Sequence, residues 1–296
     1  MGWRGSPILA GEVISLRIQF TPGENKVALV TGGSSGIGLA TARLLAQRGM
    51  HVWLTARRED VLAKALVEVQ AAQKSSNQRC GIVPADLSDW VQAQAVVARV
   101  QAEVGLPDLV VNSAGVAHPG YVQELPLEIF RQMMEINYFG TLHTIKALLP
   151  GMLERRSGYI VNLSSVAGHI GVFGYTAYGA SKYAVTGLSD ALRAEMKPHG
   201  IGVSVVFPPD TDTPQLAFEA TIKPMETKAV SGSMKALSAE AVAQDIISGV
   251  ERGRYRILPG LDNKILFALS GLLWGTIYPY MDMVVANAQR KKKKEK

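Results

Sequence analysis

The segment TGGSSGIG at residues 31–38 restricts the possible folds of this chain more than any other feature. An apolar run at residues 27–30 precedes it and predicts a buried strand, and helical spacing follows it as far as Gln47. Gly32, Gly36 and Gly38 let the backbone turn tightly and approach a pyrophosphate, whose charge is favoured at a helix N-terminus. This strand–loop–helix setting predicts a dinucleotide site, although the GxxxGxG spacing differs from the GxGxxG of other dinucleotide folds.

Strands and helices alternate along most of the remaining sequence. Short β-rich runs occur at residues 52–55, 82–84, 109–112, 159–163 and 203–207, with helical stretches between them and again at 238–249. Strands separated by helices of this length form a parallel sheet covered on both faces. The sequence therefore predicts an α/β, doubly wound parallel sheet with helices on both faces.

The predicted organisation has three parts. Residues 1–24 form an irregular N-terminal leader, 25–258 form the α/β domain, and 259–296 form an apolar helical segment with a polybasic tail. Within the domain, residues 208–234 are rich in Pro, Thr and Lys and lack clear periodicity, so they are a candidate mobile lid.

The positive charge is concentrated in the tail. The chain of 296 residues has a formal net charge of +6, but the last seven residues carry six basic side chains and one acidic, which leaves +1 for the other 289. A nearly neutral body argues against a nucleic-acid partner. A single cysteine excludes disulfide scaffolds and Cys-rich zinc modules, and we predict no metal site.

The cofactor preference follows from the end of the second predicted strand. An NAD site usually has an acidic residue there for the ribose hydroxyls, whereas an NADP site has an arginine for the 2′-phosphate. The chain has Arg57 and Arg58 and no acid before Glu59, which favours NADPH, with Arg57 as the first choice. Asp86 and Leu87 are expected at the adenine edge, and Asn112, Ala114 and Gly115 are expected to line the cofactor site.

A candidate proton donor lies in YGASK at residues 178–182. Tyr178 and Lys182 are four residues apart, so on a helix they share a face, and a nearby ammonium favours the phenolate. This pair predicts a lowered tyrosine pKa and general acid–base chemistry. Ser165, thirteen residues upstream, is placed to hold a substrate oxygen. Asn137 is a polar residue among apolar neighbours, and both a helix-kinking role and a role in the site remain open.

Taken in order, TGGSSGIG, NSAG (112–115), NYFG (137–140), Ser165 and YGASK resemble the short-chain dehydrogenase/reductase family over about residues 25–255. The resemblance implies a Rossmann fold, a nicotinamide cofactor and a homodimer or homotetramer. It implies that Tyr178 protonates the carbonyl, Lys182 lowers its pKa and binds the ribose, Ser165 orients the carbonyl and Asn137 holds a relay water. The candidate cofactor-binding residues are Gly32, Ser34, Ser35, Gly36, Ile37, Gly38, Arg57, Asp86, Leu87, Asn112, Ala114, Gly115, Tyr178, Lys182, Pro208, Thr211 and Thr213.

Three further segments resemble the 3-ketodihydrosphingosine reductases within that family. They are PPDTDTP at 208–214, the run at 221–227 that contains KPMET, and GVFGYTAY at 171–178. This resemblance implies NADPH-dependent reduction of a long-chain keto-amine, with Asp210 or Asp212 facing the substrate ammonium. The alternatives are reduction of another lipophilic ketone (hydroxysteroid, retinoid or 3-oxoacyl) and a non-catalytic NADP-binding scaffold. The complete Asn–Ser–Tyr–Lys set argues against the scaffold.

The C-terminal segment leaves three interpretations open. Residues 265–281 carry no charge, and Trp274, Tyr278 and Tyr280 precede the basic run that begins at Arg290. A buried or oligomer-forming helix, a helix in the membrane interface and a short membrane span all fit an apolar, aromatic stretch followed by lysines. An amphiphilic substrate favours the interface. We therefore expect a cytoplasmic protein peripheral on a membrane, or one on the cytosolic face of the endoplasmic reticulum in a eukaryote.

Overall fold

The computed structural model describes residues 25–231, 236–272 and 274–294 of the chain. The predicted leader at 1–24 and the end of the predicted lid at 232–234 lie outside these residues. Within them, seven parallel strands form one sheet in the order β3-β2-β1-β4-β5-β6-β9. The strands are β1 (Val27–Thr31), β2 (His51–Ala56), β3 (Cys80–Pro84), β4 (Leu109–Asn112), β5 (Gly158–Leu163), β6 (Ile201–Val206) and β9 (Arg256–Ile257).

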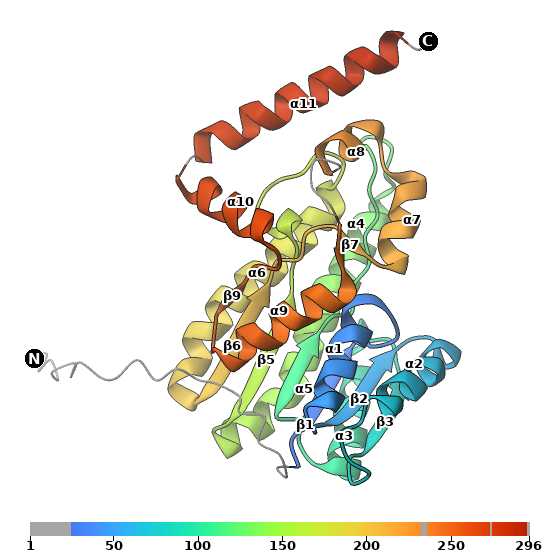
Figure 1. The fold of residues 1–296 in the computed structure, drawn as a ribbon, viewed down its shortest axis with the longest axis vertical. Coiled ribbons are helices and arrows are strands. Elements are labelled where there is room, and N and C mark those ends of the chain that lie inside the picture. Colours follow the sequence, from blue (N-terminus) through green and yellow to red (C-terminus); the bar gives the residue numbers. More distant parts are fainter. Residues whose placement is uncertain (1–24, 232–235, 273, 295–296) are drawn as a thin grey trace, which may run out of the picture.

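Helices cover both faces of this sheet, as Figure 1 shows. The major helices are α1 (Gly36–Gln47), α2 (Glu59–Ala71), α3 (Trp90–Val104), α4 (Leu127–Met133), α5 (Gly140–Arg155), α6 (Thr176–Met196) and α9 (Ala239–Glu251). The predicted doubly wound Rossmann fold is confirmed. The edge strand β9 was not predicted, because it is only two residues long.

The core consists of two layers, which the alternating residues of β1 separate. Ala28 and Val30 pack with the buried faces of α1, α2 and α9, whereas Val27 and Leu29 pack with α3, α5 and α6. Side chains of a strand alternate between the faces of its sheet, so a fully apolar run supplies both layers at once.

The sheet order reverses beside β1, whose neighbours are β2 on one side and β4 on the other. In open α/β sheets, ligands bind beyond the carboxyl ends of the strands at such a switch point. The glycine loop after β1 and the NSAG segment after β4 meet there. The fold therefore places the two segments that the sequence assigned to the cofactor side by side.

The predicted lid segment is largely helical. It contains the short strand β7 (Thr211–Asp212), which pairs with β8 (Leu237–Ser238), and the helices α7 (Pro214–Ile222) and α8 (Met225–Ser231). These helices lie at the same end of the molecule as α10 and α11 (Figure 1). The mobility of the segment stays a prediction.

The C-terminal segment forms two helices, α10 (Leu261–Leu272) and α11 (Trp274–Lys294), and α11 contacts α8. No helix in the described part of the chain combines the length and apolarity that a bilayer crossing requires. Pro279 lies inside α11. Phe267 of α10 packs against Phe207 and His169, so α10 is attached to the end of the main domain through an aromatic cluster.

Candidate active site

A cavity of about 510 Å³ lies beyond the carboxyl ends of the strands. Residues at or just beyond the carboxyl ends of β1 to β6 line it, together with parts of α6, α7, α10 and α11. Its location is the one expected for a cofactor and substrate in a doubly wound sheet.

The glycine loop forms one end of this cavity, and its glycines are required sterically. Gly32 has φ +63°, and a Cβ there would lie 2.7 Å from the backbone nitrogen of Ala114. Gly36 has φ +54°, and its Cβ would lie 2.9 Å from Cγ2 of Thr213. A side chain would disturb the loop at either position, because left-handed backbone and close approach both favour glycine.

Most predicted cofactor residues contribute to the lining of the cavity. The lining includes Gly32, Ser34, Ser35, Gly36, Ile37, Arg57, Asp86, Leu87, Ala114, Gly115, Tyr178, Lys182, Pro208, Thr211 and Thr213. Gly38 and Asn112 are not part of it. A Cβ on Gly38 would lie 2.4 Å from the Gly32 carbonyl oxygen, so this glycine serves the close packing of helix and loop.

Asn112 is not among the residues that line the cavity, and its cofactor role stays a prediction. Asn112 is the last residue of β4 and lies in register with Asn162 of β5. Its side chain is buried and donates a hydrogen bond to the Asn162 Oδ1 at 2.8 Å. The amide therefore links two central strands. Thr31 supports the same region, because its hydroxyl accepts hydrogen bonds from the backbone amides of Ser113 and Ala114.

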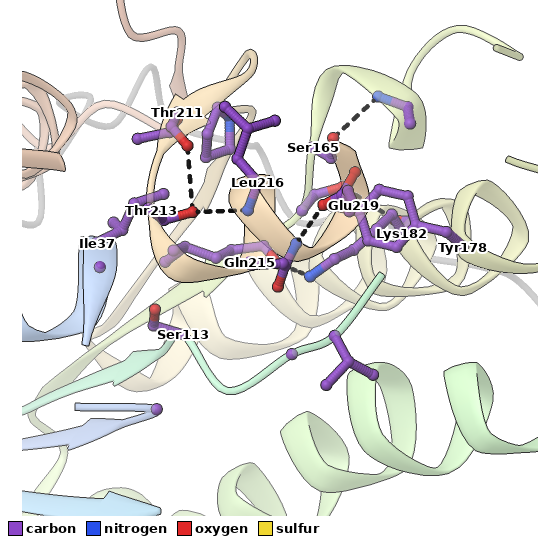
Figure 2. A pocket seen from close by; sticks show the side chains of 18 of the residues that line it. Ile37, Ser113, Ser165, Tyr178, Lys182, Thr211, Thr213, Gln215, Leu216 and Glu219 are labelled. Atoms are coloured by element: carbon purple, nitrogen blue, oxygen red, sulfur yellow. Dashed lines mark hydrogen bonds between the residues drawn. The ribbon is translucent and has the colours of Figure 1, made fainter. Parts of the chain in front are cut away.

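Tyr178, Lys182 and Ser165 all line the cavity (Figure 2). Tyr178 and Lys182 lie one turn apart on α6, and the Lys182 Nζ is 5.8 Å from the centre of the tyrosine ring. Lys182 Nζ donates a hydrogen bond to the Leu163 carbonyl at 2.9 Å. Ser165 follows β5, and its Oγ accepts a hydrogen bond from the Ala167 amide. The three predicted side chains therefore share one site.

The pKa of Tyr178 is raised, which is the opposite of the direction expected from its lysine neighbour. Burial is the main cause, and the negative charges of Glu219 and Asp210 raise the pKa further, whereas a hydrogen bond with Ser165 lowers it. Burial also lowers the pKa of Lys182 to about 8. Desolvation disfavours the charged form of both groups and is the largest cause of both shifts. Tyr178 consequently holds its proton at neutral pH.

Asn137 is fully buried in a π-helical turn, η1 (Met134–Phe139), that interrupts the α4–α5 region. Its Oδ1 accepts from the Val116 amide, and its Nδ2 donates to the Val116 carbonyl and to the Ser181 Oγ. The side chain thus fixes the loop after β4 against the helix that carries Lys182. Asn137 therefore lies in an irregular helical turn and also contacts the helix of the site, so the two roles left open by the sequence are compatible. The relay water stays a prediction.

The PPDTDTP segment contributes to the cavity unevenly. Asp210 lines it, whereas Asp212 is exposed and outside the lining, so the structure favours Asp210 over Asp212 as the residue near a bound substrate. Thr213 caps α7 by accepting a hydrogen bond from the Leu216 amide, and the Thr211 hydroxyl donates to the Pro209 carbonyl. These threonines therefore shape the loop as well as lining the cavity.

Several lining residues were not predicted. Tyr175, Gln215 and Glu219 form a polar wall beside Tyr178, and Leu266, Tyr280 and Met281 of α10 and α11 form an apolar one. One signal for α7 was present: a threonine followed by proline, which is typical of a helix N-cap and first turn. The approach of α11 to the cavity left no local signal in the sequence.

Comparisons with known proteins show the family of the chain. A family model described as short chain dehydrogenase matches residues 26–221. The chain is 37% identical to a 3-ketodihydrosphingosine reductase of Bos taurus, over 90% of this chain and 78% of the relative. It is 40% identical to a 3-dehydrosphinganine reductase of Danio rerio, over 82% of this chain and 73% of the relative.

A solved structure shares the fold. It is a short-chain dehydrogenase from Sphingobium yanoikuyae in complex with NADPH, with a TM-score of 0.72 and 26% identity, covering 86% of this chain and 95% of that one. Fold, site and relatives together define an oxidoreductase that uses a nicotinamide cofactor. The chain belongs to the short-chain dehydrogenase family.

Proposed function

We propose that this enzyme reduces the 3-ketone of 3-ketodihydrosphingosine to dihydrosphingosine with NADPH, as a step of sphingoid-base synthesis. The observation that carries the proposal is the composition of the cavity lining. The lining combines the glycine loop and Arg57, the Tyr178 and Ser165 side chains, and Leu266, Tyr280 and Met281 of α10 and α11. Cofactor-binding residues, a proton donor and apolar side chains in one cavity suit a long-chain ketone. The curated relatives named above support the same substrate.

The residues of the chain fit a dinucleotide. Gly32 and Gly36 leave room for close approach to the backbone at the start of α1, and a helix N-terminus favours phosphate. We infer a preference for NADPH because Arg57 and Arg58 line the cavity directly after β2, and no acidic residue lies between the end of β2 and Glu59. When bound, the reduced nicotinamide supplies the hydride that the carbonyl carbon receives.

In the proposed reaction, the Tyr178 hydroxyl donates its proton to the carbonyl oxygen as the alcohol forms. Its raised pKa keeps the phenol protonated at neutral pH, which is the form that reduction requires. Ser165 hydrogen-bonds the carbonyl oxygen and orients it. Lys182, held by the Leu163 carbonyl, places a positive charge behind the phenol as it loses its proton.

The proposal is tested by following NADPH oxidation with 3-ketodihydrosphingosine and with a steroid, a retinoid and a 3-oxoacyl ketone of similar apolar area. We expect the keto-amine to have the highest kcat/KM. If the enzyme reduces another of these ketones but not the keto-amine, the proposed substrate is wrong and that ketone takes its place. No turnover of any ketone, with NADPH still bound, would favour the scaffold.

We also propose that α10 and α11 attach the enzyme to a membrane surface. Leu261, Ile265 and Leu269 form an exposed apolar stripe on α10, at a spacing that places them on one helix face. Tyr280 of α11 is exposed and also lines the cavity. An apolar helix face near basic residues is typical of peripheral binding to anionic lipid.

Vesicle flotation tests this attachment. The full-length protein should float with anionic vesicles and remain below when Leu261, Ile265 and Leu269 are replaced by serine, with NADPH binding retained. Equal flotation of both proteins would show that another surface binds lipid. Whether such a membrane is the endoplasmic reticulum, and whether the enzyme is a homodimer or homotetramer, remain proposals with separate tests: fractionation of cells and light scattering.

A further inference from the structure

A buried polar cluster forms the wall of the cavity next to the proton donor. Tyr175, at the start of α6, donates a hydrogen bond from its hydroxyl to the Glu219 Oε2 on α7. Gln215 donates to the Glu219 Oε1 at 3.1 Å. Lys223 Nζ lies 3.2 Å from the Asp210 Oδ2 and 3.5 Å from the Glu219 Oε2. Glu219 is close enough to Tyr178 for its charge to raise the pKa of that residue, and both are labelled in Figure 2.

The charges within this cluster do not cancel. Among the described residues, the ion pairs of Asp210 and Glu219 both go to Lys223, so two carboxylates share one ammonium. The Glu219 side chain is 7% exposed, whereas that of Asp210 is 34% exposed and so accessible to solvent. A buried carboxylate is costly unless it is paired and hydrogen-bonded. The excess negative charge therefore concentrates on the buried Glu219, which faces the cavity.

The position of this charge is unfavourable for a neutral ketone. Glu219 and Asp210 raise the pKa of Tyr178, so they oppose loss of the phenol proton during reduction. A positively charged substrate bound at Glu219 would remove that penalty. In an amino ketone of the proposed class, the amine is on the carbon next to the ketone, so the ammonium must lie close to Tyr178.

We propose that Glu219, held in place by Tyr175 and Lys223, binds the ammonium group of the amino-ketone substrate. This proposal rests on the proposed function. It names the residue that would recognise the ammonium group, which a sphingoid ketone has and a neutral ketone lacks. The rings of Tyr175 and Tyr178 are 5.3 Å apart, so the cluster lies within reach of a group next to the reacting carbon. A carboxylate has about four acceptor positions. The partners above occupy three at most, which leaves room for one ammonium N–H.

Glu219 suits this role better than Asp210. The Asp210 carboxylate makes the shorter contact with Lys223 and is partly hydrated, so its charge is largely compensated. Glu219 is more deeply buried, is farther from Lys223 and interacts with the hydroxyl of Tyr175, which lines the same cavity. Lys223 and Asp210 are positioning residues that hold Glu219 and α7 in place.

The test compares two ketones that differ only in the amine. The first is 3-ketodihydrosphingosine, and the second is the same 1-hydroxy-3-ketone with hydrogen in place of the amino group. Glu219→Gln keeps the shape and the hydrogen bond from Tyr175 but removes the charge. It should lower kcat/KM for the amino ketone about 10- to 100-fold, the effect of a charge-assisted hydrogen bond. It should not lower kcat/KM for the des-amino ketone, because loss of the Glu219 charge makes loss of the Tyr178 proton easier. Glu240→Gln, which removes an exposed carboxylate on α9, should leave kcat/KM unchanged for both ketones.

Two results would overturn the proposal: an equal loss with both ketones, which indicates a structural or cofactor role for Glu219, and no loss with either. Tyr175→Phe provides a second variant should Glu219→Gln fold poorly. It keeps the ring and removes the hydroxyl that orients Glu219. A loss of about 3- to 10-fold confined to the amino ketone supports the site, and an unselective loss contradicts it.

Binding separates this site from the proposed function. The NADP⁺-loaded wild type should bind dihydrosphingosine at least about 10-fold more tightly than N-acetyl-dihydrosphingosine, and Glu219→Gln should remove most of that difference. If the wild type reduces no keto-amine but still shows Glu219-dependent binding of the long-chain amine, the function fails and the ammonium site stands. If it reduces the keto-amine and the variant discriminates amines as before, the site fails and the function stands.

Discussion

Replacing Lys223 by methionine tests the physical basis of the cluster directly. The lysine side chain is 4% exposed and lies between the carboxylates of Asp210 and Glu219. Methionine keeps most of the apolar stem and removes the ammonium, which also lies 5.7 Å from the centre of the Tyr175 ring. Glu219 then remains buried without a cation, while Asp210 is hydrated in its partly exposed position.

The expected loss of stability follows from this asymmetry. Removing one member of a buried ion pair costs about 3–5 kcal/mol. Hydration of Asp210 and the remaining hydrogen bonds to Glu219 place this site at the lower end, so we expect about 3 kcal/mol. Glu219→Gln alone leaves the pair between Lys223 and Asp210 and should cost about 1 kcal/mol. The double variant has no stranded buried charge and should cost about 2 kcal/mol, which gives a coupling of about 2 kcal/mol.

Urea unfolding followed by circular dichroism measures these free energies, and Arg43→Met is the matched control. Arg43 also lies between two carboxylates, at 3.5 Å from Glu68 and 4.0 Å from Glu240, but its side chain is 41% exposed. Exposed pairs contribute less than about 1 kcal/mol. A loss below about 1 kcal/mol for Lys223→Met, or strict additivity with Glu219→Gln, would refute the buried-charge reasoning.

Four further outcomes are expected from the active site and the loop beside it. Tyr178→Phe should lower kcat for ketone reduction at least about 100-fold while NADPH binding, measured by fluorescence, changes little. Arg57→Glu should lower kcat/KM with NADPH by about 10- to 100-fold and leave NADH within about threefold; equal effects on both would exclude a 2′-phosphate contact. Because the Lys182 pKa is lowered to about 8, its ammonium is lost as pH rises through that value, so kcat/KM for reduction should fall above about pH 8; a profile that stays flat to pH 10 contradicts this. Gly174→Ala should destabilise the fold by at least about 2 kcal/mol in urea, because Gly174 has φ +78° and a Cβ there would lie 2.1 Å from the Thr227 Oγ1; Thr227→Ala should relieve part of that loss.

The strands and helices of the core could be predicted from the sequence, whereas the helices α7 and α8 of the lid could not, and the difference has a physical reason. Each major strand of the sheet was recognisable because its apolar residues are contiguous, and α1 was recognisable from its apolar face. In α7 the buried residue is Glu219, and in α8 the buried residues are Glu226 and Thr227. Helices that bury polar side chains carry no apolar periodicity, so the rule that found the core could not find them.

The site was predictable where a residue acts through its own position in a motif. Tyr178, Lys182 and Ser165 needed only spacing and the strand–helix order. The orientation of a side chain at the end of a strand was not predictable, as Asn112 shows by pointing into the sheet. The direction of the Tyr178 pKa was also wrong, because it depends on burial and on Glu219, which is distant in sequence.

Hydrogen bonds of polar side chains connect the lid segment to the segments that resemble one group of reductases. The sequence alone gave no structural reason why these segments should occur together. Tyr175 of GVFGYTAY bonds Glu219, and the Thr227 hydroxyl of KPMET donates to the Phe173 carbonyl at 3.0 Å. Glu226 accepts a hydrogen bond from the Tyr121 hydroxyl, which raises the pKa of Tyr121 to about 12.

Each of these contacts exchanges a protein hydrogen bond for water when it opens, so its net contribution is about 1–3 kcal/mol, less than that of a buried apolar face. The polar side chains that hide this segment from apolar periodicity also hold it in place mainly by hydrogen bonds and ion pairs. The predicted mobility of the segment would then require no loss of a buried apolar face, and Glu219, the proposed ammonium ligand, lies on this segment.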